Sequence, residues 1–136
     1  MVIRYSYLWR ADFQRGQEEG EKDRPCAIVL VVNESARGKI VTVLPITHSP
    51  PGKSELAVEL SEGTKRRLGL DNERSWVVLN ESNRFRWPGP DIRRANPRDP
   101  SSFVFGQLPY ASFVRIREGF LKAVAEHRIS RVDRTE

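Results

Sequence analysis

The pattern of apolar and polar positions along the chain predicts a succession of short strands. Residues 26–33 form a continuous Val/Ile/Leu run, as expected of a strand that is buried on both faces. A polar turn then leads into a second apolar run over residues 40–46, and the two runs predict a β-hairpin with a loop. In all, strands are predicted over residues 3–13, 26–33, 40–46, 56–60 and 75–82.

The same pattern predicts two helices. Ser61 is a suitable N-cap for a short helix that runs through residues 65–68, and Gly69 is a suitable C-terminal stop. Between residues 113 and 124 the apolar positions recur at helical spacing, which predicts an amphipathic helix near the C-terminus. Gly119 lies within this helix and weakens it by about 1 kcal/mol relative to alanine.

The order of these elements predicts a mainly β domain with helical additions, arranged as a small, partly closed β-barrel. A chain of 136 residues is long enough to bury a core without disulfides. We therefore expect a single domain over residues 1–125, followed by a polar tail over residues 126–136 that frays. The arginine-rich, proline-rich segment 86–100 is expected to be an irregular loop.

Charge and cysteine content narrow the class of protein. The net charge of +5 and the pI near 9.8 favour a polyanionic or acidic partner. The single cysteine, Cys26, cannot form an internal disulfide, so no oxidising compartment is required. Charges interrupt the N-terminus too early for a signal peptide, and the longest apolar run is too short to cross a bilayer. We expect a cytoplasmic protein with no membrane contact.

Two residues mark the ends of the predicted hairpin. Arg24 opens the first strand as part of "RPCAIVLVV", and Thr47 closes the second as part of "VTVLPITHS". Both also fit ordinary strand boundaries, where a charged or hydroxyl side chain is common. The alternative is a binding site built where the two strands end.

Four segments, in the same order, resemble the MazF/PemK family of toxin ribonucleases. "GQEEGEKDRPCAIVLVV" resembles the family's acidic, glycine-containing approach to an Arg-Pro strand, and "VTVLPITHS" resembles its second strand end. "SWVVLNESNRF" looks like the third core strand, and "FGQLPYASFVRIREGFLKAV" looks like the C-terminal helix with its preceding segment. The resemblance covers roughly residues 5 to 125.

This resemblance implies an SH3-like β-barrel, usually a homodimer, that cleaves single-stranded RNA without a metal or other cofactor and is inhibited by a cognate antitoxin. The family's catalytic arginine and threonine correspond to Arg24 and Thr47. Its loop glutamate corresponds to Glu19 and its strand-end acid to Glu81. A nearby basic residue of the family corresponds to Arg84.

The implied reaction uses the ribose 2′-OH as nucleophile and leaves a 2′,3′-cyclic phosphate and a 5′-OH. Arg24 suits phosphate binding because its guanidinium is always charged and binds two oxygens at once. Thr47 can donate a hydrogen bond to a phosphate oxygen. The base that accepts the 2′-OH proton is open among Glu19, Glu81 and His48.

The chain departs from the family pattern at two places. His48 follows the threonine where a small hydroxyl residue is usual, and the serine is displaced to Ser49. Strand alternation would point His48 away from Thr47. Leu79 occupies a position where some members carry a further basic catalytic residue, and Arg84 and Arg86 are the available substitutes.

Arginines interleaved with aromatic residues, as in "NRFRW", commonly bind single-stranded nucleic acid. Arg84, Arg86 and Trp87 are therefore predicted RNA contacts, together with Ser49 at the strand end. Two other functions stay open: a non-catalytic toxin that acts by protein binding, like the CcdB-type gyrase poisons of the same fold, and an RNA-binding module with degenerate catalytic groups.

Overall fold

The computed structural model describes residues 1–9, 23–34, 38–52, 56–87, 92–93, 104–126 and 130–134. Nine strands and two helices lie in these ranges, in the order β1 (Val2–Tyr5), β2 (Arg24–Glu34), β3 (Gly38–Thr47), β4 (Ala57–Glu59), α2 (Glu62–Leu68), β5 (Trp76–Val78), β6 (Glu81–Trp87), β7 (Ile92–Arg93), β8 (Val104–Gly106), α3 (Tyr110–Ala125) and β9 (Ser130–Asp133). The mainly β architecture with a C-terminal helix is confirmed.

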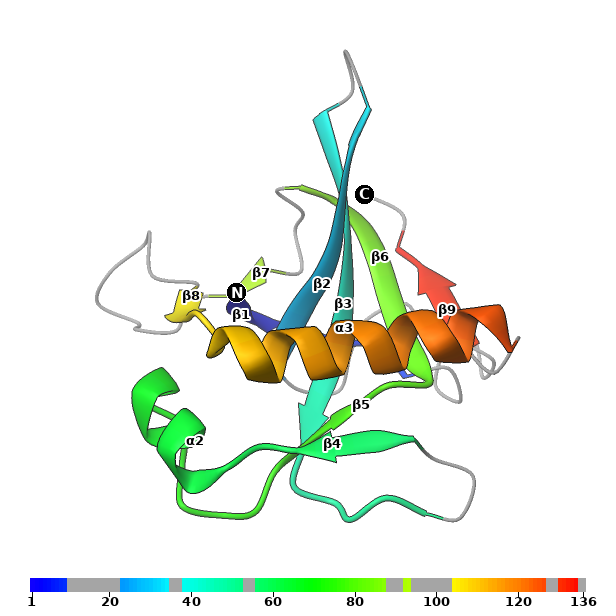
Figure 1. Ribbon diagram of the computed structural model, residues 1–136. Helices are drawn as coiled ribbons and strands as arrows, with labels where there is room; N and C mark the ends of the chain where they lie inside the picture. The colour runs from blue at the N-terminus through cyan, green and yellow to red at the C-terminus, as the bar shows by residue number, and fades with distance from the viewer. Residues whose placement is uncertain are drawn as a thin grey trace.

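Strands β2 and β3 form the long hairpin at the centre of a mostly antiparallel sheet (Figure 1). β1 pairs with the outer edge of β2, and the short strands β7 and β8 pair with the other edge of β1. The free edge of β3 is shared: β6 pairs with its first half and β5 with its last two residues. β4 completes this side by pairing with β5.

The segment 75–82 is not the single strand that its sequence predicts. Val43 is opposite Asn83 and Ile46 is opposite Val77, so the partner segment uses six residues where β3 uses three. The extra residues form a bend at 79–80, which divides the segment into β5 and β6. The bend is held because the Leu79 amide donates to the Leu56 carbonyl oxygen at 2.7 Å.

The prediction for the first strand is correct in type and too long. Strand β1 ends at Tyr5, the described residues 6–9 are not strand, and residues 10–13 lie outside the described residues. The predicted fraying of the tail is wrong for residues 130–134. β9 pairs in parallel with β6. Successive side chains of a strand face opposite sides, so Val132 is buried while its neighbours Arg131 and Asp133 are exposed.

The two helices confirm their predicted signals. Ser61 Oγ accepts a hydrogen bond from the Thr64 amide at 3.1 Å and caps α2, while Gly69 ends it with a left-handed φ of 69°. α3 begins three residues earlier than predicted and lies across the β2–β3 hairpin (Figure 1). Neither helix in the described part of the chain is long and apolar enough to span a bilayer.

Two hydrophobic cores lie on opposite faces of the hairpin. Ala27 and Leu44 belong to the core beneath α3, whereas their neighbours Cys26 and Val43 belong to a second core with aromatic residues of β1 and β6. Residues 26–30 of the apolar run in β2 therefore pack into the two cores, as predicted, whereas Val31 and Val32 are 52% and 57% exposed, so the prediction of a strand buried throughout is wrong at its end. The second core includes a stacked pair, Tyr5 and Phe85, with ring centres 4.6 Å apart.

The sheet curls so that the chain after β1 meets β6. Asn83 Oδ1 accepts from the Leu8 amide at 2.9 Å, and Asn83 Nδ2 donates to the Leu8 carbonyl oxygen at 2.8 Å. Arg134 adds to this junction, since its Nη1 donates to the Ser6 carbonyl oxygen at 2.8 Å and to Asn83 Oδ1 at 3.1 Å. Among the described residues, side-chain bonds rather than a strand pair join these two edges, so closure into an SH3-like barrel stays a prediction.

Candidate active site

A cleft of about 370 Å³ opens where β2 begins and β3 ends. Cys26 is opposite Pro45 in the hairpin, so Arg24 and Thr47 each lie two residues beyond that pair, at the same end of adjacent strands. The cleft is lined by Trp9, Asp23, Arg24, Pro25, Ile46, Thr47, His48, Ser49, Leu70, Asp71 and Ser75. The structure therefore brings together four of the predicted site residues: Arg24, Thr47, His48 and Ser49.

Arg24 is held against an aromatic side chain at the wall of this cleft. Its guanidinium carbon lies 4.9 Å from the centre of the Trp9 ring, and Trp9 in turn contacts Tyr7 edge-on at 5.2 Å. Arg24 Nε is buried and has no hydrogen-bond partner among the described residues. A buried cationic donor without an acceptor is costly, and an anionic ligand would satisfy it.

Thr47 is oriented by the turn that follows β3. Its Oγ1 accepts a hydrogen bond from the Ser49 amide at 3.2 Å. Because the hydroxyl oxygen accepts this bond, the hydroxyl hydrogen is available to donate to a ligand oxygen in the cleft. Ser49 thus has a structural role at the strand end as well as a place in the cleft lining.

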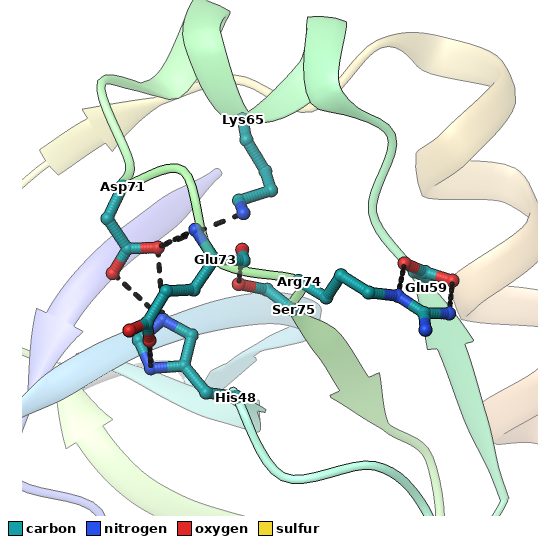
Figure 2. Close-up of polar contacts among 7 residues, drawn as sticks. All are labelled: His48, Glu59, Lys65, Asp71, Glu73, Arg74 and Ser75. Atoms are coloured by element: carbon teal, nitrogen blue, oxygen red, sulfur yellow. Dashed lines mark hydrogen bonds and ion pairs between the residues drawn. The ribbon is translucent and has the colours of Figure 1, made fainter.

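His48 lines the cleft, but its ring is directed toward two carboxylates (Figure 2). Nε2 lies 2.8 Å from Asp71 Oδ2, and Nδ1 lies 3.0 Å from Glu73 Oε2. Both acids belong to the loop that follows α2, and the buried side chain of Lys65 lies 3.8 Å from Asp71 Oδ1. No sequence pattern indicates these partners, because two acids in a polar loop are common and only the fold places them beside His48.

Burial raises the pKa of two further side chains, Tyr7 and Cys26. It raises the pKa of the Tyr7 hydroxyl well above its usual range, and the Glu81 carboxylate raises it further, while Arg24 acts in the opposite direction. Burial also raises the pKa of the Cys26 thiol far above its usual value. Cys26 is therefore an inert core residue, in agreement with its place in an apolar run.

The other predicted site residues that the structure describes lie outside the cleft lining. Glu81 begins β6 and is half-buried. Arg84 is opposite Thr42, five residues before Thr47, which corresponds to about 16 Å along the strand. Arg84 forms an ion pair with Asp133 at 3.3 Å, and Arg86 and Trp87 lie farther along β6. Glu19 lies outside the described residues.

Leu79 occupies the core rather than any site. Its side chain is 6% exposed and belongs to the core beneath α3. A Cβ built on Gly119 would lie 2.7 Å from Leu79 Cδ1, which shows how closely the helix approaches this residue. Position 79 therefore contributes to the core beneath α3 and supplies no group to the cleft.

A second and larger hollow, of about 600 Å³, lies between α3, the hairpin and β6. Apolar side chains dominate its lining, and three of them are exposed: Val32 by 57%, Leu121 by 39% and Val124 by 45%. Arg84 and Arg131 form its polar rim. We call this surface the apolar groove.

Comparison with known proteins identifies the family. No curated protein and no solved structure matches the chain. A family model does match, over residues 7–85: the PemK-like, MazF-like toxin of type II toxin–antitoxin systems. The match covers more than half of the chain and includes β2, β3 and the whole cleft lining. The chain therefore belongs to the PemK-like, MazF-like toxins of type II toxin–antitoxin systems.

Proposed function

We propose that this toxin is a metal-independent endoribonuclease that cleaves single-stranded RNA in the cleft between Arg24 and Thr47. Membership of the family implies an endoribonuclease and a cognate antitoxin. The observation that carries the proposal is the buried, unpartnered Nε of Arg24 at the wall of a solvent-accessible cleft. A phosphodiester is an anion of suitable size and supplies the missing acceptor.

In the proposed reaction the ribose 2′-OH attacks the adjacent phosphorus, and the bond to the 5′-oxygen of the next nucleotide breaks. Arg24 binds two phosphate oxygens and stabilises the additional negative charge of the transition state. The Thr47 hydroxyl donates to one of those oxygens and fixes its position. A base removes the 2′-OH proton, and the leaving oxygen gains a proton to become the 5′-OH.

Glu19, Glu81 and His48 are the three candidates for the base. His48 follows Thr47 in the chain and lines the same cleft, yet both of its ring nitrogens face carboxylates and one pair must break before it can accept a proton. Replacing the base should lower the cleavage rate by about 10²–10⁴-fold and remove its limb of the pH–rate profile. The variants Glu19→Gln, Glu81→Gln and His48→Gln distinguish the three residues by this criterion.

Arg84, Arg86 and Trp87 remain proposed RNA contacts. Their distance from Thr47 along the sheet means that they would contact nucleotides away from the bond that is cleaved. Phosphate contacts of this kind raise affinity without selecting sequence. Their replacement should raise KM and leave kcat nearly unchanged.

We also propose that the toxin is a homodimer joined through the apolar groove. Val32, Leu121 and Val124 are exposed apolar side chains gathered in this one groove, an arrangement suited to contact with another protein surface. A two-fold dimer buries such a patch against its own copy. Leu121→Asp should shift the mass measured by sedimentation from dimer to monomer, whereas Tyr110→Asp, at an exposed residue outside the groove, should not.

The test of cleavage is incubation of a long single-stranded RNA with the purified toxin in excess chelator. Discrete cuts with cyclic-phosphate ends, lost in folded Arg24→Ala and Thr47→Ala, are the expected result. Absence of cleavage by folded, antitoxin-free toxin across varied RNAs would contradict the proposal. Inhibition of DNA gyrase, or RNA binding without cleavage, would then support one of the two non-catalytic alternatives.

A further inference from the structure

We propose that His48, Asp71 and Glu73 form a binding site for a divalent first-row transition metal ion of the Zn²⁺ class at the rim of the cleft. Each residue offers one ligand atom, and these three atoms all lie within 4.8 Å of one another. The three side chains are exposed, so an ion can enter from solvent without a change of fold. Figure 2 shows the imidazole between the two carboxylates.

The spacing of the ligand atoms is suited to a coordination shell. Two ligands at about 2.1 Å from a tetrahedral ion are about 3.4 Å apart, and the three ligand atoms here lie within 4.8 Å of one another. Asp71 lies 2.8 Å from Nε2 and Glu73 lies 3.0 Å from Nδ1, on the other side of the ring. An ion would bind one of these nitrogens, and the exposed side chains of Asp71 and Glu73 would rotate to bring one oxygen each toward it. Three protein ligands leave the remaining positions to water.

Asp71 is oriented for this role by neighbours that are not ligands. Its Oδ1 accepts a hydrogen bond from the Glu73 amide at 3.0 Å and lies 3.8 Å from Lys65 Nζ. These contacts fix the carboxylate, as outer-shell partners do in metal sites, with Oδ1 at 3.1 Å and Oδ2 at 2.8 Å from His48 Nε2. They also fix the backbone between the two acids, so both carboxylates are presented to the same ring.

The local charge favours a dication with an imidazole ligand. Two carboxylates against one ammonium, that of Lys65, leave a net negative charge when His48 is neutral. An imidazole with two carboxylates suits Zn²⁺, Ni²⁺ and Co²⁺ better than Mg²⁺ or Ca²⁺, which prefer oxygen ligands alone. Ion binding would displace any proton that bridges His48 to an acid.

Occupancy of this site does not depend on RNA cleavage, so binding is the test. Zn²⁺ is titrated calorimetrically into the full-length toxin, its Asp71→Asn and Glu73→Gln variants, and the matched control Glu59→Gln. Glu59 is also an exposed, ion-paired acid but lies outside the cluster. We expect one equivalent of Zn²⁺ to bind to the unmodified toxin and to Glu59→Gln, and to bind at least about tenfold more weakly to the other two.

A second readout uses the unmodified toxin and so does not depend on how the variants fold. The chain has two histidines, His48 and His127, whose ring resonances can be followed separately by NMR. We expect Zn²⁺ to shift the ring resonances of His48 and leave those of His127 unchanged. No binding, equal binding by all variants, or a shift of His127 alone would overturn the proposal.

Discussion

The guanidinium of Arg24 lies 4.9 Å from the centre of the Trp9 indole ring, so that one face of the cation is fixed against an aromatic wall of the cleft. The Trp9 ring in turn contacts the buried ring of Tyr7 edge-on. This stacking orders the long side chain of Arg24 before any ligand binds. It also explains how a strand-end arginine can be both solvent-accessible and fixed.

We predict that Trp9→Ala lowers kcat/KM for RNA cleavage by about five- to thirtyfold, the equivalent of a cation–π contact of 1–2 kcal/mol. Trp9→Phe should retain most of the activity, because a phenyl ring still provides a face for the guanidinium. Cleavage rates of the two variants, with folding checked by circular dichroism, test this. Equal activity of Trp9→Ala and the unmodified toxin would show that Arg24 is positioned by other contacts.

We predict that Asn83→Ala destabilises the toxin by about 2–4 kcal/mol, because it leaves buried main-chain groups of Leu8 without partners. The control is Asn80→Ala. Asn80 is half-buried and accepts a longer bond, 3.3 Å, from the Leu56 amide, so its loss should cost about 1 kcal/mol. Urea denaturation of the two variants measures the difference. Equal costs would mean that the junction between Leu8 and β6 adds little to stability.

We predict opposite effects for alanine at two helical glycines. Gly63 in α2 has nothing within 4 Å of a built Cβ, so Gly63→Ala should stabilise the toxin by about 0.5–1 kcal/mol. At Gly119 a Cβ would meet the buried side chain of Leu79 at 2.7 Å, and the strain should exceed the gain in helix propensity. Thermal unfolding of both variants tests the signs.

The double variant Leu79→Ala with Gly119→Ala separates packing from propensity. If close contact with Leu79 makes Gly119→Ala unfavourable, the same change should become favourable once Leu79 is truncated. An unchanged cost in the Leu79→Ala background would show that the strain arises elsewhere.

We predict that stability falls with pH above about 8.5, the usual pKa of a thiol, because of Cys26. Its pKa is raised by burial, so the folded protein keeps the thiol protonated while the unfolded chain ionises. Below the pKa of the thiol in the unfolded chain, the contribution of Cys26 to the free energy of unfolding is therefore fully present. Above that pKa, the free energy of unfolding falls by about 1.4 kcal/mol per pH unit.

The check is the free energy of unfolding at several pH values from about 7 to 9, below the range in which the unfolded tyrosines ionise. Cys26→Ala should be less stable at neutral pH, since a core side chain is truncated, but should show a shallower decline with pH. Parallel curves for the two proteins would contradict a buried, neutral thiol.

The hairpin end could be predicted from the sequence because its signals are local. Arg24 and Thr47 flank two apolar runs joined by one turn, and antiparallel pairing then requires that they lie at the same end. The roles of Ser61 and Gly69 as helix caps could be predicted equally well, since helix caps depend on residues within a few positions. Each of these predictions involves little more than one supersecondary unit.

The partners of His48 could not be predicted from the sequence because they are not local in the chain. Asp71 and Glu73 reach it only because β3 pairs with β5 and brings the loop after α2 alongside the strand end. The parallel pairing of β9 with β6 is likewise non-local, and a short polar strand has no distinctive pattern of its own. Long-range pairing, which residue periodicity does not encode, decided both outcomes.

The central claim is that Arg24 and Thr47 act on one phosphate, and a double-mutant cycle tests it most directly. Cleavage rates of the unmodified toxin, Arg24→Lys, Thr47→Val and the double variant are measured on one RNA in excess chelator. If both residues hold the same phosphate, the two losses should be non-additive, with a coupling of at least about 1 kcal/mol. Fully additive losses, or a double variant that cleaves as fast as the unmodified toxin, would contradict a phosphate held by both residues.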